Sequence, residues 1–226
     1  MYLAAGLAVL AVGAALQLYA RFVHARCERI QDRALPSGSV AARRMLDANG
    51  LRDIALHRVE QRLADHYSAA SSCVFLSDKV YAGHNITSLA VACHECGHAL
   101  QHAQGSRALK RELALSPVTE LCSWLWLVVL LVGYISQADA LCVAGLAICA
   151  IAFVLSAASL PAELNASSRA LSFLKGAGPN MQPLLDEQQA AAAQSVLRAS
   201  AAAYLSTASL GIGILLRKIA AYLTAG

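Results

Sequence analysis

Charged residues are scarce in this chain of 226 residues. Only 14% of them are Asp, Glu, Lys or Arg, whereas 58% are hydrophobic, and the mean hydropathy is positive at +0.52. This balance excludes an ordinary soluble domain, in which about a quarter of the residues are charged. The composition therefore predicts a membrane protein.

Basic residues are absent before the first apolar run, residues 2–20, and the arginines follow it. A cleaved signal peptide would carry positive charge ahead of its apolar core. The run has the roughly 20 residues that a spanning helix needs, with Gln17 as its one strongly polar side chain. We therefore expect a retained signal anchor rather than a cleaved signal peptide.

Two further apolar runs, 117–136 and 140–160, are separated only by Gln-Ala-Asp. Ser116 followed by Pro117 is typical of a helix start, and Pro161 is expected to end the second run and to begin a new helix. So short a connection predicts a helical hairpin that leaves one membrane face and returns to it. A fourth run, 199–216, is weaker because it is rich in alanine, serine and threonine.

The basic residues set the expected orientation. Of the 18 Lys and Arg, 13 lie between positions 21 and 111, and none lies before the first span or in the turn at 137–139. By the positive-inside rule, the segment 21–115 is cytoplasmic, at a plasma or inner membrane. Eight acids are interleaved with these basic residues, which favours a solvated face beside anionic lipid over a nucleic-acid interface.

These features predict a multi-pass protein that is mainly α-helical with a small α+β cytoplasmic part. We expect an N-terminal transmembrane anchor at 1–20, a cytoplasmic part at 21–115, a transmembrane hairpin at 116–160, a second cytoplasmic segment at 161–198, and a C-terminal transmembrane helix and tail at 199–226. Within the cytoplasmic part, helices are expected at 39–49 and from about Asn85, and a strand at 72–77. Strand signals at 53–59 and 65–71 are weaker.

The stretch VACHECGHALQH, residues 91–102, contains the pattern His-Glu-x-x-His at His94, Glu95 and His98. At roughly 100° per residue, the two histidines lie about 40° apart on one face of a helix, where they can bind one zinc ion while Glu95 serves as a base. Cys93 and Cys96 fall on the opposite, apolar side. They are expected to be small core residues, and the alternative is a thiol redox pair.

A catalytic zinc ion keeps three protein ligands, so a third ligand is needed. His102 lies about 12 Å from His94 by helical rise alone, which excludes it. Glu163 follows the hairpin closely, and the hairpin would return it to the membrane face that carries the histidines. A solvated glutamate at a helix start is the alternative, and Glu120 and Asp186 are the fallback carboxylates.

Four stretches carry a resemblance to a known family: the N-terminal span, DHY at 65–67, LSDKVYAGHNITSLAVACHECGHALQ at 76–101, and LPAELNASSRAL at 160–171. Over nearly the whole chain, the sequence resembles the bacterial neutral zinc metallopeptidases of the YugP type. It is also similar to gluzincins with a membrane hairpin inserted between the two halves of the site, as in the CAAX and heat-shock membrane proteases. The resemblance implies a zinc-dependent endopeptidase with a zincin-like fold, in which His94, His98 and Glu163 bind zinc and Glu95 is the catalyst.

Two positions depart from these relatives. Ser167 stands where the related proteases commonly have an acid, four residues after the third ligand, and Ser168 stands where family members often have arginine. Neither departure removes a ligand. A non-catalytic membrane protein with a structural zinc ion is the remaining alternative, and it would need a fourth protein ligand.

The mechanism that the resemblance implies is hydrolysis of a protein or peptide substrate by zinc-activated water. It leaves open which residue stabilises the oxyanion. The candidates are His66, Tyr67, Tyr81, His84 and His102. The strand at 73–77 is expected to offer an edge to an extended substrate.

Overall fold

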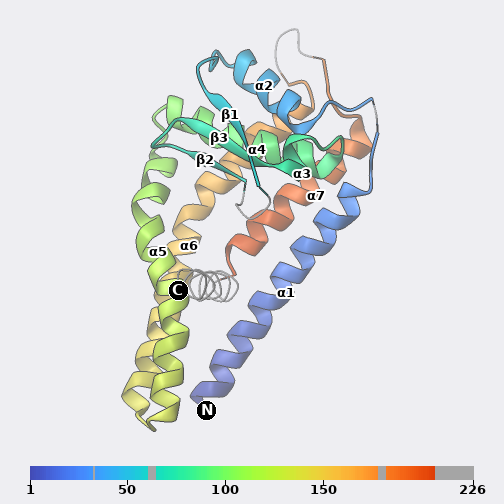
Figure 1. The fold of residues 1–226 in the computed structure, drawn as a ribbon. Coiled ribbons are helices and arrows are strands. Elements are labelled where there is room, and N and C mark those ends of the chain that lie inside the picture. The colour runs from blue at the N-terminus through green and yellow to red at the C-terminus, as the bar shows by residue number, and fades with distance from the viewer. Residues whose placement is uncertain (33, 61–64, 178–181, 207–226) are drawn as a thin grey trace. The chain divides into compact units, whose positions relative to one another are not determined.

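Helices make up most of the described chain, residues 1–32, 34–60, 65–177 and 182–206, and three short strands form a sheet (Figure 1). In this computed structural model the elements follow in the order α1 (Tyr2–Glu28), α2 (Gly38–Ala48), β1 (Ala55–Val59), β2 (His66–Ser68), β3 (Cys73–Ser77), α3 (Asp78–Tyr81), α4 (Ile86–Ala103), α5 (Arg107–Ile135), α6 (Asp139–Leu174) and α7 (Glu187–Tyr204). The predicted class, mainly α-helical with a small α+β part, is confirmed at this level.

The elements divide into two units. The first, which we call the apolar unit, contains Met1–Tyr19 and Arg111–Leu160 together with the described residues from Ala202. The second, the site unit, contains Ala20–Lys110 and Pro161–Ala201. Helices α1, α5, α6 and α7 each contribute residues to both units.

The apolar unit is built from helices that expose hydrophobic side chains. Among the described helices, α1, α5 and α6 are long and apolar enough to cross a membrane. Val132, Val143 and Phe153 are each about half exposed, whereas Trp126 and Leu130 are buried in the core of the unit. Such a surface suits lipid better than water.

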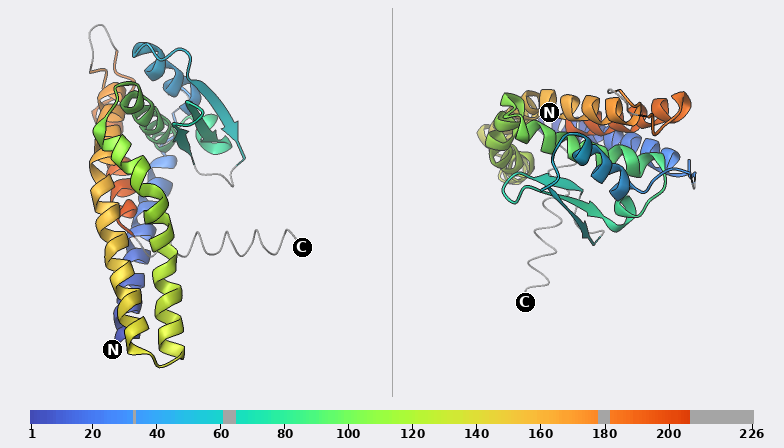
Figure 2. Two further views of the ribbon diagram at one scale, coloured as in Figure 1. Left: turned by 90° about the vertical axis from the view of Figure 1, so that its left-hand side faces the viewer. Right: turned by 90° about the horizontal axis from the view of Figure 1, so that it is seen from above.

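Helices α5 and α6 form the predicted hairpin, lying side by side and joined at one end by a tight turn (Figure 2). Gln137 in that turn has a φ of 56°. Glycines allow the two helices to approach closely: a Cβ atom at Gly133 would lie 2.6 Å from the backbone nitrogen of Cys142, and one at Gly145 would lie 2.8 Å from that of Leu130. The prediction of two helices joined as a hairpin is therefore confirmed, and the crossing of a membrane by that hairpin stays a prediction.

Two predicted helix boundaries are wrong, both at a proline. Pro117 lies inside α5 and Pro161 lies inside α6, so neither begins a helix. A proline inside a helix leaves the carbonyl four residues earlier without its N–H partner. In α5 that carbonyl belongs to Leu113. It accepts a hydrogen bond of 3.3 Å from the hydroxyl of Ser116, the residue expected to cap a new helix. Serine hydroxyls can replace the missing donor in this way in membrane helices.

The two terminal spans also differ from the prediction or extend beyond what is described. Helix α1 continues past position 20 to Glu28, and its last residues belong to the site unit. The predicted fourth span, 199–216, begins inside α7, which starts at Glu187. Its residues from 207 onward lie outside the described residues.

The sheet of the site unit has the strand order β1-β3-β2, with β1 parallel and β2 antiparallel to β3. Val74 and Leu76 of β3 are fully buried, and α4 packs against β2 and β3. The strand predicted at 72–77 is confirmed, and the weaker signals correspond to β1 and β2. The expectation that this strand offers an edge is wrong for its residues 73–75, which pair with β1 on one side and with β2 on the other.

Helix α4 begins where the sequence predicts because Asn85 caps it. The Asn85 side chain accepts a hydrogen bond of 2.9 Å from the backbone N–H of Ser88. Ile86 and Leu89 on its first turn are fully buried. The earlier helix, α2, is followed by Gly50 with a φ of 76°, as the glycine after the predicted helix indicated.

Candidate metal centre

Two helices of the site unit supply the candidate ligands. His94 and His98 lie one turn apart on α4, and Glu163 lies on α6. The two helices approach closely at Gly97, where a Cβ atom would lie 2.6 Å from the carbonyl oxygen of Ala166. This contact between a glycine and a backbone brings residues that are distant in sequence onto one site.

The donor atoms of the three residues converge. Nε2 of His94 lies 3.2 Å from Nε2 of His98 and 3.2 Å from Oε2 of Glu163. Nε2 of His98 lies 3.6 Å from Oε1 of Glu163, and the donor atoms of all three residues lie within 4.8 Å of one another. The three side chains are 13%, 11% and 14% exposed, so the site is largely shielded from solvent.

The second ring nitrogen of each histidine faces another side chain. Nδ1 of His94 lies 3.1 Å from the hydroxyl of Ser167, and Nδ1 of His98 lies 3.0 Å from Oε1 of Gln101. Both Nε2 atoms are thereby directed at Glu163. Two imidazoles and a carboxylate form a donor set that suits a catalytic zinc ion, with one position left for water. The residues present therefore fit zinc.

Glu95 lies beside the three donors and is held by β2. Its carboxylate accepts a hydrogen bond of 3.0 Å from the backbone N–H of Tyr67. Burial raises the pKa of the Glu95 carboxyl to about 7, although the charge of His94 opposes the rise. A group with a pKa near 7 can take up and release a proton at neutral pH. Burial also lowers the pKa of His98, which favours the neutral imidazole that binds a metal.

Comparison with known proteins agrees with this donor set. The family described as "Putative neutral zinc metallopeptidase" matches residues 1–223. The chain belongs to this family. A curated relative, "Putative membrane protease YugP" from Bacillus subtilis (strain 168), is 33% identical over 187 residues, which cover 83% of this chain and 81% of the relative. No solved structure matches the chain.

The two cysteines of α4 are buried in the core. Cys93 and Cys96 are both fully buried, and Sγ of Cys96 lies 3.6 Å from the carbonyl oxygen of Ala42 on α2. Burial raises the pKa of both thiols. A buried thiol with a raised pKa is a poor nucleophile, so the geometry does not favour a redox pair.

Tyr67 and His102 are the two oxyanion candidates that are linked to Glu95. The hydroxyl of Tyr67 lies 2.8 Å from Nδ1 of His102, and the Tyr67 backbone holds Glu95. His102 is exposed and is not part of the donor group, as its distance along the helix predicts. The pair therefore lies beside Glu95 and outside the three-residue donor group.

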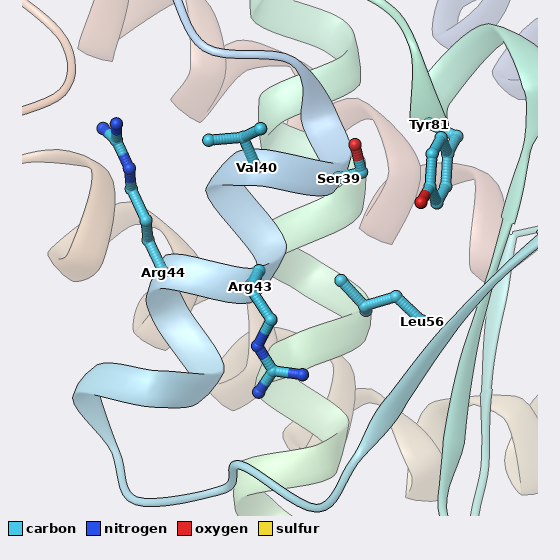
Figure 3. A pocket seen from close by; sticks show the side chains of 6 residues that line it. All are labelled: Ser39, Val40, Arg43, Arg44, Leu56 and Tyr81. Atoms are coloured by element: carbon cyan, nitrogen blue, oxygen red, sulfur yellow. The ribbon is translucent and has the colours of Figure 1, made fainter.

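The other three oxyanion candidates contact residues outside the donor group. Nδ1 of His84 lies 2.8 Å from the carbonyl oxygen of Leu35, and the ring of His66 stacks on Phe75. Tyr81 lines a cavity of about 390 Å³ between α2, β1 and α3 (Figure 3). The remaining lining residues are Ser39, Val40, Arg43, Arg44 and Leu56. None of the three zinc-ligand candidates lines that cavity.

Sequence reasoning assigned no role to Gln101 or Ser167, although both carried a signal. Gln101 follows His98 by three residues and Ser167 follows Glu163 by four, which are helical spacings that share a face. Ser167 was noted only as a departure from the acid found in related proteases. Its hydroxyl nevertheless reaches a histidine of the site. The fallback carboxylates, at positions 120 and 186, are not part of the donor group.

Proposed function

We propose that this chain is a membrane-embedded, zinc-dependent endopeptidase that hydrolyses protein or peptide substrates near the cytoplasmic face of a plasma or inner membrane. The observation that carries the proposal is the convergence of His94, His98 and Glu163 beside Glu95 in a chain of the zinc metallopeptidase family. The site unit would then be zincin-like, with both histidines on one helix and a small sheet packed against it.

His94, His98 and Glu163 would hold the zinc ion. When bound there, zinc makes water more acidic and polarises the carbonyl of the peptide bond. Glu95 takes a proton from the attacking water and passes it to the leaving nitrogen as the carbon–nitrogen bond breaks, so that hydrolysis yields a carboxylic acid and an amine. Its pKa of about 7 suits both transfers, and the Tyr67 N–H holds its carboxylate in place.

Composition and charge support the location. In the part of the chain that the structure describes, three helices are long and apolar enough to cross a membrane, and the relative from Bacillus subtilis is named as a membrane protease. The concentration of basic residues between positions 21 and 111 favours a cytoplasmic location for the site unit. The lipid bilayer is then a partner of the apolar unit, and nucleic acid is not an expected ligand.

The peptidase reading has more support than a structural zinc site. A structural zinc ion needs a fourth protein ligand, and the donor group found among the described residues has three members. The thiol redox reading is weaker still, because it requires the two buried cysteines of α4 to be reactive.

The experiment that tests the proposal uses the full chain purified in detergent. It should contain about one zinc ion per molecule and should cleave an unfolded protein such as casein. A chelator should abolish cleavage, and added zinc should restore it. A chain that binds zinc and cleaves nothing would contradict the proposed activity.

Cysteine-accessibility labelling in cells tests the location. A cysteine introduced at position 29 should be protected from a membrane-impermeant reagent, and one introduced at position 138 should react. The reverse pattern would overturn the cytoplasmic assignment.

A further inference from the structure

Gln101 joins the two helices that carry the donors. Its side chain is fully buried on α4, one turn beyond His98. Oε1 of Gln101 lies 3.0 Å from Nδ1 of His98. On the other side, its Nε2 donates to the carbonyl oxygen of Ala162 (2.8 Å) and to Oδ1 of Asn165 (3.0 Å), both on α6. One amide thus contacts a histidine of one helix and the residue preceding Glu163 on the other.

The polarity of this network is determined by groups that cannot reverse their roles. A backbone carbonyl only accepts, so the Gln101 amide must turn its NH₂ group toward Ala162. Arg169 only donates, and its Nε donates to the same Oδ1 of Asn165 at 2.7 Å, which identifies that atom as an acceptor. The Gln101 oxygen is therefore the atom that faces His98, and Nδ1 of His98 must carry the proton.

This assignment selects one tautomer of His98. A neutral imidazole carries a proton on one nitrogen only, so Nε2 of His98 holds a lone pair, and that atom faces Glu163 and His94. The hydroxyl of Ser167 can donate or accept, so its contact with His94 selects no tautomer. The two histidines are therefore supported in different ways.

We propose that Gln101 is a positioning residue of the metal centre: it holds His98 in the tautomer that binds a metal and, through the Ala162 carbonyl, sets the place of Glu163. This inference rests on the zinc site of the proposed function. A partner of this kind commonly changes metal affinity by about 10- to 100-fold.

Zinc affinity of the apo chain in detergent, measured by competition with a chromogenic chelator, tests the inference without any peptidase assay. Gln101→Met keeps the volume and removes the hydrogen bonds, and it should weaken zinc binding by about 10- to 100-fold. Gln104→Met changes an exposed residue at the end of the same helix and should leave the affinity unchanged. An unchanged affinity of the Gln101→Met variant would overturn the inference.

A second variant separates positioning from general packing. Gln101→Glu still offers His98 an acceptor oxygen but loses the donor to Ala162 and Asn165, so it should bind zinc more tightly than Gln101→Met while melting at a lower temperature. A purely structural role predicts that zinc affinity follows melting temperature across the variants, and that result would refute the inference.

A variant at an exposed position of α6 tests the same network from the other helix. Asn165→Ala should weaken zinc binding, but less than Gln101→Met does. An unchanged zinc affinity of Asn165→Ala would contradict the inference even if the Gln101 variants failed to fold.

These experiments distinguish failure of the inference about Gln101 from failure of the proposed peptidase function. A wild-type chain that binds zinc and cleaves nothing would refute the peptidase and leave the role of Gln101 standing. A chain that binds no zinc would refute both.

Discussion

The two units of the chain differ in the helix contacts that each contains: hydrophobic side chains form the core of the apolar unit, whereas polar side chains lie at the contact between α4 and α6 in the site unit. In the apolar unit, α5 and α6 pack through glycines and hydrophobic residues, and large apolar side chains remain exposed. In the site unit, α4 meets α6 through Gln101, Ser167 and the three candidate ligands, with Gly97 between them. Lipid leaves apolar packing as the main contact between helices, whereas buried polar groups must find hydrogen-bond partners. Helix α6 takes part in both kinds of contact: it packs through apolar side chains against α5 and through polar side chains against α4.

The largest expected difference between the two units, in zinc content and cleavage, comes from substitution of Glu163. Glu163→Ala removes one of three donors and should abolish both zinc binding and peptide cleavage. Glu163→Gln should also fail, because an amide lacks the negative charge of the carboxylate. Zinc content and cleavage would be measured in parallel with Glu120→Ala in the apolar unit and Asp186→Ala in the site unit, both of which should retain zinc. A Glu163→Ala chain with full zinc content and activity would show that the ligand is elsewhere.

A matched pair of glycine substitutions compares the two helix contacts directly. In Gly97→Ala the new Cβ would lie 2.6 Å from the Ala166 carbonyl oxygen, and in Gly145→Ala it would lie 2.8 Å from the Leu130 nitrogen. Each should cost about 1–3 kcal/mol of stability through overpacking, measured as a lower melting temperature in detergent. Only Gly97→Ala should also weaken zinc binding. Equal effects on zinc affinity would mean that the two contacts are not independent.

The smallest effect on the metal is expected from the cysteines of α4. The Cys93→Ser, Cys96→Ser double variant should keep one zinc ion per chain, because both thiols are buried in the core and neither belongs to the donor group. It should lose some stability, since a buried hydroxyl needs a hydrogen-bond partner. Metal analysis together with thermal melting checks both statements, and loss of zinc would indicate that the cysteines take part in metal binding.

Local sequence patterns were enough to predict which face of α4 carries the histidines and about where the helix begins. His94 and His98 follow from the spacing of four residues, and Asn85 marks the helix start. The same spacing places Cys93 and Cys96 on the opposite side, where both are buried. Local rules suffice here because each depends only on neighbours within one helix.

The prolines and the sheet required information that local rules do not contain. The sequence predicts a helix start at Pro117 because proline usually interrupts a helix, but the Ser116 hydroxyl donates to the Leu113 carbonyl that the proline leaves without a partner. The central place of β3 depends on which strands pair, which its own sequence does not specify. Glu163 could be reached only through the hairpin and the family resemblance. Gln101 needed the contact with Ala162 on the other helix.

The measurement that tests the central claim most directly is zinc content and cleavage of Glu95→Gln, purified beside the wild-type chain. Our account assigns Glu95 to proton transfer, because its carboxylate is held by the Tyr67 N–H and stands outside the three-residue donor group. The variant should therefore keep about one zinc ion per chain and lose peptide cleavage. Retained cleavage, or loss of the metal, would contradict the account.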